Sequence, residues 1–502
     1  MYLKARRFEL LVLFLTWVAF AMRVLGLDFQ SLWRDEVDTL SFATRALPDL
    51  LETFRKPGEN GPAFFLALRS WLAAGGHSEF ALRFPSAWAG TLAVPVIYVL
   101  VKRLAGRLPA LIAILLAATA PYLIWYGQEA KMYAALTLLV PLSLWLTVEA
   151  AQRGGLWRWL LLYLVTTLCF YTHLLAVLVV PVQELWLLTV PSGRRTARRW
   201  ITAVIYLAAL LLPYLPLLRW QAGMWLSPFE TGHPFVPLGD ILAVLAVAYS
   251  RGVLPVKAPI SLLPALLALV AGFGLWAAGH SAQPVSSVPP ARGDRWRVVA
   301  MLAVWLFLPP LAVYGVSLGM PVFTDRYVIW SMPAFLALAS LGIVALARVW
   351  RPVGATVLVA MLAASLAGVW AQDSRPIKSD FRSAARFVLD HKRPGDLLIF
   401  QIPYNRYAFS YYSNAGVPEA LSATGELPWM DGPFTNNDAN EVSVAEQMAQ
   451  GTAGSRAVWL IASEVPMWDQ RELTRSWLSG NGMATDHADF ARVAVTRYEL
   501  KK

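Results

Sequence analysis

Three carboxylates lie within four residues directly after the first apolar segment of the chain, at Asp35, Glu36 and Asp38. Charge so close to a lipid bilayer is expensive, and ionisable groups kept there usually have a function. A carboxylate at a membrane-bounded cavity can act as a general base if it reaches the proton that it removes. Asp35 is the first candidate for that base, with Glu36 orienting it or binding a metal ion. The competing interpretation is a solvated acidic loop without chemistry.

A loop rich in proline and glycine follows two cations, Arg55 and Lys56, and contains Asn60. Such a loop can hold a phosphate group, with Lys56 as the point charge. The alternative is anchoring at the membrane surface, where long basic side chains reach the lipid headgroups. The sequence leaves both interpretations of Lys56 open.

Two further polar clusters interrupt apolar segments. The first could fix a ligand or the acidic loop, or serve only as a polar hinge; it contains Gln128, Glu129, Lys131 and Tyr133. The second contains Arg326 and Tyr327, where the permanent charge of Arg326 suits a phosphate, although Arg and Tyr also anchor helices at the membrane surface. His173 lies between two short apolar segments, where a structural hydrogen bond is the commoner role for a single histidine.

The composition is that of a membrane protein. Of 502 residues, 57% are hydrophobic and 15% charged, whereas soluble domains are about 45–50% apolar and about 25% charged. The net charge of +11 does not indicate nucleic acid, because the basic residues cluster in short loops between apolar segments. The sequence contains neither a P-loop motif nor a pair of His or Cys residues at metal-ligand spacing.

Eleven apolar segments approach the length of about 20 residues that a membrane span needs. They are 8–27, 82–101, 108–126, 131–149, 157–172, 174–190, 200–219, 258–279, 298–317, 327–347 and 352–371. Basic residues mark every second loop, which predicts a cytoplasmic N-terminus. Because the number of spans is odd, the C-terminal region is expected outside. The first segment lacks a small-residue cleavage site, so we expect a retained span.

The expected fold class is a polytopic α-helical membrane protein with a small external α/β domain. Residues 1–372 form the expected transmembrane domain, with a long first external loop at 28–80. Residues 373–502 carry more charge and alternate helical stretches with short apolar runs, which predicts a separate α/β domain. The expected strands are 397–402, 457–462 and 492–498. All the polar clusters fall on the external side, which predicts one external, membrane-facing site.

Taken together, these motifs resemble those of polytopic glycosyltransferases of the C-type fold. The nearest group is the bacterial relatives of protein O-mannosyltransferases and of lipid A aminoarabinose transferases. The motifs that carry the resemblance are Trp33-x-Asp35-Glu36, 78–87 with Gly90, 128–133, 171–173, 326–327, 380–386, 393–396 and 411–412. Two positions depart from the family pattern. Asn60 begins a stretch where the family often has a His-Pro-Pro-type element, and Lys131 stands where the family often has Arg.

The resemblance implies an enzyme of the bacterial inner (plasma) membrane that transfers a hexosyl or pentosyl group. The donor would be a polyprenyl-phosphate sugar, and the acceptor a lipid, protein or polysaccharide reached from the periplasmic side. Asp35 would deprotonate the acceptor while Lys56, Arg326 and Tyr327 bind the donor phosphate. The remaining motif residues would line the substrate cavity: Asn60, Gln128, Glu129, Lys131, Tyr133 and His173. A single displacement predicts inversion at the anomeric carbon.

No cofactor is indicated with certainty, although the adjacent carboxylates of Asp35 and Glu36 keep a divalent metal open. A flippase or transporter of a lipid-linked glycan is the main alternative function. Transporters usually bind near the bilayer midplane and have repeated halves, whereas this sequence gathers its charges at one face and shows no repeat. A ligase for lipid-linked polymers would share fold and donor, and a non-catalytic scaffold would not need the acidic loop.

Overall fold

The structure is a computed structural model that describes residues 2–189, 196–226, 233–253, 262–276, 292–414 and 427–501. The chain divides into two compact units. Unit 1 comprises Met1–Leu25, Ala46–Ala67 and Arg83–Gln372, and unit 2 comprises Gly26–Arg45, Leu68–Leu82 and Asp373–Lys502. Two stretches of the first loop therefore belong to the same unit as the C-terminal residues, and one of them carries Asp35 and Glu36.

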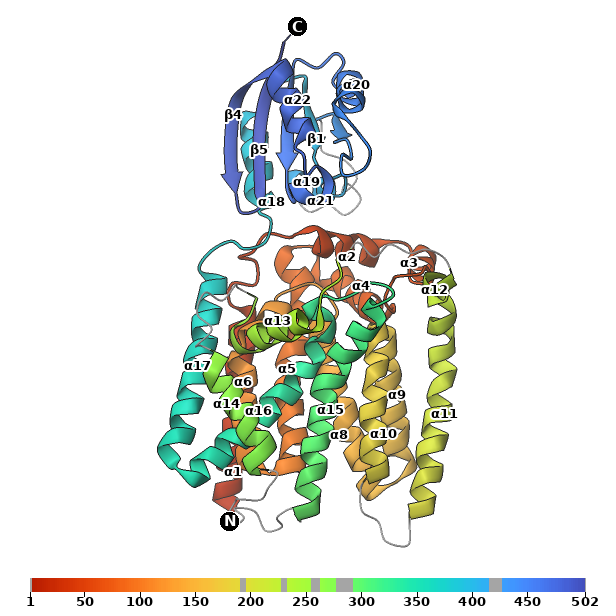
Figure 1. Cartoon of the computed structure of the whole chain (residues 1–502), viewed down its shortest axis with the longest axis vertical. Helices are drawn as coiled ribbons and strands as arrows, with labels where there is room; N and C mark the ends of the chain where they lie inside the picture. The colour runs from red at the N-terminus through yellow and green to blue at the C-terminus, as the bar shows by residue number, and fades with distance from the viewer. Residues whose placement is uncertain are drawn as a thin grey trace. The chain divides into compact units, whose positions relative to one another are not determined.

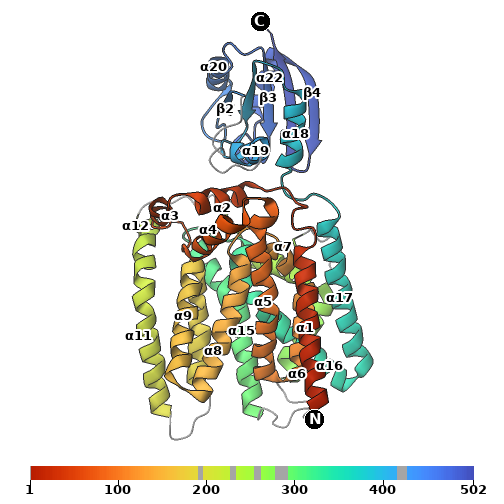
Figure 2. The same cartoon turned by 180° about the vertical axis from the view of Figure 1, so that it is seen from behind.

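Unit 1 is helical, its long helices run roughly side by side (Figures 1 and 2), and helix α13 lies across them (Figure 1). Its helices up to the chain's midpoint are α1 (Tyr2–Val24), α3 (Leu47–Thr53), α6 (Arg107–Thr119), α7 (Pro121–Gly127), α8 (Tyr133–Arg153), α9 (Leu156–Thr172), η1 (Leu174–Leu178), α10 (Val179–Thr189), α11 (Thr196–Gln221), α12 (Gly223–Leu226) and α13 (Leu238–Arg251). They are followed by α14 (Leu263–Ala271), η4 (Gly272–Trp276), α15 (Arg292–Ser317), η5 (Asp325–Ser331), α16 (Met332–Val349) and α17 (Arg351–Asp373). Three helices contain unit boundaries: α4 (Ala63–Gly75), α5 (Glu79–Ala105) and α17, whose last residue, Asp373, belongs to unit 2.

Six helices in the described part of the chain are long and apolar enough to cross a membrane, and the bent pair α6–α7 makes a seventh if it is one span. The six are Glu79–Ala105, Tyr133–Arg153, Trp200–Gln221, Arg295–Ser317, Asp325–Val349 and Arg351–Asp373. Each of the eleven segments expected from the sequence overlaps a helix, although both ends of 258–279 lie outside the described residues. The chain is therefore a mostly helical integral membrane protein, and the number eleven stays a prediction.

The most enclosed candidate span of unit 1 is Asp325–Val349, which joins η5 to α16. Its apolar window is fully buried, whereas only 22% of the window in α11 is buried. Small residues allow the close approach around α16, since a Cβ at Gly342 would overlap the backbone of Ala268 and Gly272. The exposed leucines of α11, such as Leu212 at 71%, form the kind of apolar surface that lipid covers. Burial thus separates a central helix from a peripheral one.

Unit 2 contains a five-stranded sheet in the order β2-β1-β3-β5-β4. Strand β1 pairs in parallel with β2 and β3, and β5 pairs antiparallel with β3 and β4. Its elements are α2 (Arg34–Thr44), α18 (Phe381–His391), β1 (Asp396–Phe400), α19 (Asn405–Ser413), β2 (Trp429–Asp431), α20 (Glu441–Gly451), β3 (Ala457–Ala462), α21 (Val465–Trp468), α22 (Leu473–Asn481), β4 (Gly482–Phe490) and β5 (Val493–Leu500). The core of the sheet is apolar and includes Ile399, Leu460, Met448 and Leu478.

The three strands expected from apolar runs correspond to β1, β3 and β5, whereas β2 and β4 were not expected. Both missed strands lie at the edges of the sheet. Strand β4, Gly482–Phe490, is largely exposed, and Thr, Asp and His interrupt its apolar residues, so it has no apolar run to reveal it. Strand β2 is only three residues long. Edge strands of this kind are short or polar because they need not bury both faces.

Candidate functional site

Three motifs that lie far apart in the sequence meet in unit 1. The ring centroid of His173 lies 5.1 Å from that of Tyr327 and 6.4 Å from that of Tyr133. Tyr133 and Tyr327 are 6.5 Å apart, and the guanidinium of Arg326 lies 5.9 Å from the centroid of the Tyr133 ring. The start of α8, the end of α9 and the start of η5 therefore build one aromatic cluster with a cation at its side, which we call the His173 cluster.

The protonation of His173 follows from its backbone surroundings. The residue leaves α9 in an extended conformation, and its Nδ1 accepts the backbone N–H of Leu175 at 3.2 Å. A nitrogen that accepts a hydrogen bond carries no proton, so the proton of the neutral ring lies on Nε2. The side chain is 2% exposed, and Nε2 has no hydrogen-bond partner among the described residues. A buried N–H donor of this kind suits an anionic ligand.

The loop that carries Lys56 and Asn60 packs against the same end of α9. Asn60 Oδ1 accepts the backbone N–H of Leu174 at 3.4 Å, next to His173. A Cβ at Gly61 would overlap the backbone of Tyr171. Glycine at this position therefore permits the close approach, and the loop adds a fourth predicted motif to the neighbourhood of His173.

Gln221, at the end of α11, holds the first half of that loop. Its Oε1 accepts the backbone N–H of Gly58 at 2.8 Å, and its Nε2 donates to the carbonyl oxygens of Glu59 at 3.0 Å and Lys56 at 3.4 Å. Gly58 has a φ of 88°, a conformation that glycine adopts without strain. The Lys56 side chain itself is exposed. Sequence reasoning missed Gln221, because nothing local marks a residue 163 positions from its partner.

The third predicted cluster, 128–133, is divided between two roles. Gln128 Nε2 donates to the carbonyl oxygen of Leu25 at 3.2 Å and to that of Met22 at 3.5 Å, so it caps the end of α1. Glu129 is 1% exposed, whereas Lys131 is half-buried. Tyr133 belongs to the His173 cluster. The amide of Gln128 thus bonds to the backbone of α1, whereas the ring of Tyr133 lies in the His173 cluster.

A row of tyrosines continues the His173 cluster and was not expected from the sequence. Tyr126 lies 5.4 Å from Tyr133 and 5.0 Å from Tyr122, measured between ring centroids. Tyr122 OH donates to Asp325 Oδ2 at 3.1 Å. Asp325 directly precedes Arg326, so the row ends at a neighbouring anion and cation. The spacing of four residues between Tyr122 and Tyr126 is the signal that places both on one side of α7.

The acidic cluster lies in unit 2, at the first turn of α2. Glu36 is fully buried, and its Oε2 accepts a hydrogen bond from Lys378 Nζ at 2.9 Å. Asp35 is half-buried, and the Asp38 carboxylate lies 3.9 Å from the guanidinium of Arg34. Neighbours in the sequence therefore have different surroundings. Among the described residues, no group of three or more His, Cys, Asp or Glu side chains is placed to hold a metal ion.

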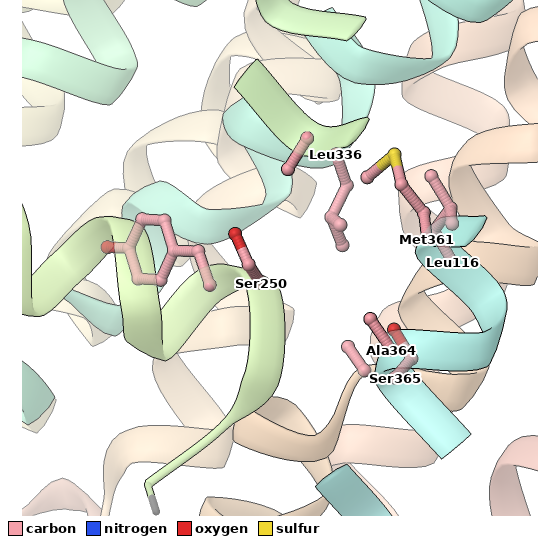
Figure 3. A pocket seen from close by; sticks show the side chains of 9 residues that line it. Leu116, Ser250, Leu336, Met361, Ala364 and Ser365 are labelled. Atoms are coloured by element: carbon pink, nitrogen blue, oxygen red, sulfur yellow. The ribbon is translucent and has the colours of Figure 1, made fainter. Parts of the chain in front are cut away.

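A separate small pocket of unit 1 lies between α6, α13, α14, α16 and α17 (Figure 3). Its lining includes Leu116, Ser250, Leu336, Met361 and Ser365. The volume of about 10 Å³ is room for roughly one water molecule. This pocket is too small for a sugar or a lipid phosphate and is no candidate for the substrate site.

Comparisons with known proteins agree with this architecture. Residues 57–220 match the family described as dolichyl-phosphate-mannose-protein mannosyltransferase. Comparison with curated proteins gives no match. The matched stretch covers Asn60, the 128–133 cluster and His173, whereas Lys56, the acidic cluster and Arg326 lie outside it.

The fold is similar to that of two solved proteins. ArnT from Cupriavidus metallidurans in the apo state has a TM-score of 0.57 at 12% identity, covering 98% of this chain and 97% of that one. The same protein bound to undecaprenyl phosphate has a TM-score of 0.55 at 13% identity, with the same coverage. The oligosaccharyltransferase AglB from Archaeoglobus fulgidus, in complex with an inhibitory peptide and a dolichol-phosphate, has a TM-score of 0.56 at 11% identity and covers 99% and 74%. The expected resemblance to glycosyltransferases of the C-type fold is thereby confirmed.

Proposed function

We propose that this protein is a membrane glycosyltransferase that transfers one hexosyl or pentosyl group from a polyprenyl-phosphate donor to an acceptor. The observation that carries the proposal is the convergence of separate motifs on the His173 cluster, where a buried N–H donor and a guanidinium lie beside aromatic rings. Donors and cations at one place suit a phosphate group, and aromatic rings suit the faces of a sugar or a prenyl chain. The solved proteins bound to undecaprenyl phosphate and dolichol-phosphate have the same fold.

In this proposal the donor phosphate binds beside the His173 cluster. Arg326 supplies a permanent charge and a planar set of donors, and His173 Nε2–H supplies a neutral one. Lys56 adds a point charge from a loop that Gln221 holds. Tyr327 provides a ring and a hydroxyl at the same place. Together these groups stabilise the negative charge that gathers on the phosphate as it leaves the sugar.

Asp35 is the proposed general base. It takes the proton from an acceptor hydroxyl or amine while the acceptor oxygen or nitrogen forms a bond to the anomeric carbon. The bond between that carbon and the phosphate oxygen breaks, and its electron pair leaves with the polyprenyl phosphate. A single displacement inverts the anomeric configuration. Glu36 performs no bond-forming step in this scheme, and its carboxylate is paired with Lys378.

The finer assignments belong to the same proposal. The remaining cavity residues are Asn60, Glu129, Lys131 and Tyr133, with Gln128 supporting them through its cap on α1. The membrane is the bacterial inner membrane, crossed by eleven spans, with the N-terminus in the cytoplasm and residues 373–502 on the periplasmic side. The acceptor is a lipid, a protein or a polysaccharide on that side.

The test is sugar transfer in proteoliposomes that contain a radiolabelled polyprenyl-phosphate sugar and a membrane extract as acceptor. Asp35→Asn is expected to lower the transfer rate by about 10²–10⁴-fold. The matched control is Asp49→Asn, which removes an exposed acid from the same loop and is expected to leave transfer unchanged. Equal transfer by the native chain and by Asp35→Asn would remove Asp35 as the base.

One observation favours a second candidate, a flippase of a lipid-linked glycan. The pair α6–α7 is bent by 56°, and broken spans are common in transporters. The same proteoliposomes separate the two functions, because a flippase moves intact labelled lipid to the other leaflet and makes no new product. Parallel reactions with and without EDTA decide whether a divalent metal takes part.

A further inference from the structure

The acidic helix α2 is held by residues that come more than 330 positions later in the chain. Glu36, in its first turn, forms a buried ion pair with Lys378, in which Lys378 Nζ lies 2.9 Å from Oε2 and the two side chains are 6% and 0% exposed. Breaking such a pair leaves an uncompensated buried charge, which is strongly unfavourable. The pair therefore fixes the rotation of the first turn of α2 about its axis.

Residues on either side of Asp35 have similar partners in unit 2. The Arg34 guanidinium lies 3.7 Å from the centroid of the Tyr404 ring. The backbone N–H of Leu32 donates to the hydroxyl of Tyr412 at 2.6 Å. Positions 32, 34 and 36 are thus each bound to a different C-terminal side chain. These three contacts bracket Asp35 without involving its carboxylate.

The segment that precedes α2 is also held in place, by hydrogen bonds between the Gln30 side chain and backbone groups of unit 2. Gln30 Oε1 accepts the backbone N–H groups of Ile377 at 2.9 Å and Lys378 at 3.3 Å, and its Nε2 donates to the Arg375 carbonyl at 3.0 Å. Residues 375–378 therefore hold the first loop at two points, through Gln30 and through Glu36. We call this stretch the α2 clamp.

The second loop stretch of unit 2 strengthens the same arrangement. Glu79 accepts hydrogen bonds from Arg382 at 2.6 Å and from the Tyr412 hydroxyl. Burial, followed by the charge of Glu79, raises the pKa of the Tyr412 phenol, which keeps it protonated as a donor. Tyr412 OH also accepts from Ser31 at 3.2 Å. One phenol thus joins both loop stretches to α19.

We infer that Lys378 is a positioning residue for the proposed base: the C-terminal part of the chain, through the buried Lys378–Glu36 pair of the α2 clamp, sets the orientation of α2 and with it the direction of the Asp35 carboxylate. The inference rests on the proposed function, in which Asp35 removes the acceptor proton. A general base works only within hydrogen-bond reach of its proton. A displacement of about 1 Å can lower a rate by about 10²-fold. Glu36 is then an anchor for α2 and not a second catalytic acid.

The kinetic test compares Lys378→Met, Lys378→Arg and the native chain in the transfer assay. Lys378→Met is expected to lower kcat by about 10²-fold with little change in the KM of the lipid donor, because Arg326 and Lys56 are untouched. Lys378→Arg keeps the ion pair and is expected to recover most of the rate. The matched control, Arg393→Met, removes a cation from the exposed pair with Glu499 and should leave kcat unchanged.

An outcome in which Lys378→Met keeps the native kcat would overturn the inference. So would a rise in the donor KM with unchanged kcat, because that pattern indicates a ligand-binding residue. Failure of the native chain to transfer any sugar would instead contradict the proposed function. A second measurement is therefore needed that does not depend on transfer.

Cysteine labelling supplies that measurement. The only cysteine of the chain, Cys169, is fully buried and gives a silent background for a charged maleimide. The substitution Asp35→Cys places a thiol on α2, in the native background and together with Lys378→Met or Arg393→Met. Labelling of the Asp35→Cys thiol is expected to be several-fold faster together with Lys378→Met, which breaks the clamp. Together with Arg393→Met it should match the rate in the native background. Equal rates in all three backgrounds would contradict the positioning role, whether or not the native chain transfers sugar.

Discussion

His173 shows at the residue scale how a backbone contact prepares a side chain for a ligand. The N–H of Leu175 occupies Nδ1, so the buried Nε2 carries the proton. A neutral donor is useful beside Arg326, since a second full charge would repel the guanidinium. Substitutions can separate the two roles of His173, as an N–H donor and as an aromatic ring.

His173→Phe keeps an aromatic ring but removes the Nε2–H donor. Loss of a hydrogen bond to a charged group costs about 1.5–3 kcal/mol, so the KM of the polyprenyl-phosphate sugar is expected to rise about 10- to 100-fold. His173→Gln can place an amide N–H near the position of Nε2–H and is expected to retain more of the affinity. Donor titration of the transfer rate measures both. If the two variants bind the donor as tightly as the native chain, His173 is not a donor ligand.

Several members of the site could be predicted one by one from the sequence. Asn60, Tyr133, His173 and Arg326 stand out because each is polar or aromatic at the end of an apolar run. The residues that hold the Lys56 loop and Glu36 in place could not be predicted. Gln221 and Lys378 act through contacts that span more than 160 and 340 positions of the chain, and neither residue belongs to a local pattern that marks such a contact.

At the scale of elements, the break between α6 and α7 positions the 128–133 cluster. Pro121 begins α7 and has no N–H to donate. Arg23 donates hydrogen bonds to the carbonyls at the end of α6 instead. Its Nη2 lies 3.2 Å from the Ala117 carbonyl oxygen, and its Nη1 lies 3.4 Å from that of Ala118. A cation at a helix C-terminus is favourable. Gln128, at the end of α7, caps the end of α1 in turn. Side-chain hydrogen bonds therefore link α1 and the α6–α7 pair in both directions.

Arg23→Met is therefore expected to destabilise this junction. The side chain is 1% exposed, and leaving buried carbonyls without donors costs about 1–3 kcal/mol each. We expect a lower melting temperature in detergent and a lower kcat, because the 128–133 cluster loses its support. Arg158→Met, which removes a single contact with the Gly154 carbonyl, is the control. A native melting temperature for Arg23→Met would show that the junction does not depend on this cap.

The apolar runs predicted the positions of the long helices, because a span must be apolar over its length. The sequence did not predict the 56° bend at Pro121, since a proline also occurs at the start of straight helices. It also missed β4, whose polar residues lie on an exposed edge. Elements that depend on a neighbour for their shape leave a weaker local signal than elements that depend on their own composition.

At the scale of the whole molecule, unit 2 contains a buried ion pair beside its apolar core. Asp396 Oδ1 lies 2.9 Å from Arg497 Nη2, and Trp459 Nε1 lies 3.0 Å from Asp396 Oδ2. Burial alone would raise the pKa of Asp396, but the hydrogen bonds from Arg497, the Arg393 backbone and Trp459 outweigh it and hold the pKa below its usual range. The pair joins β1 to β5 across β3.

The stability of the sheet should therefore depend on pH in a definite direction. Because the pKa of Asp396 is lowered on folding, its contribution is present above the unfolded value of about 3.9 and is lost as the pH falls through the folded value. Arg497→Met leaves a buried carboxylate without its cation, which costs about 3–5 kcal/mol at neutral pH. In that variant acidification should stabilise the sheet, because protonation removes the buried charge.

Hydrogen exchange of the β1 and β5 peptides in the intact protein, corrected for the intrinsic rate at each pH, measures this effect. The native chain should lose protection below about pH 4, and Arg497→Met should gain protection over the same range. Arg475→Met, at an exposed pair with Glu472, should follow the native chain. The same pH dependence in Arg497→Met and the native chain would contradict the assigned role of the pair.

The most direct test of the central claim follows the two halves of the donor. A polyprenyl-phosphate sugar labelled in the sugar and, separately, in the phosphate is supplied to the native protein in proteoliposomes with an acceptor extract. We predict that each sugar transferred releases one polyprenyl phosphate, that the product carries no labelled phosphate, and that its anomeric configuration is inverted. Labelled phosphate in the product, retention of configuration, or movement of intact donor between leaflets without a product would contradict the account.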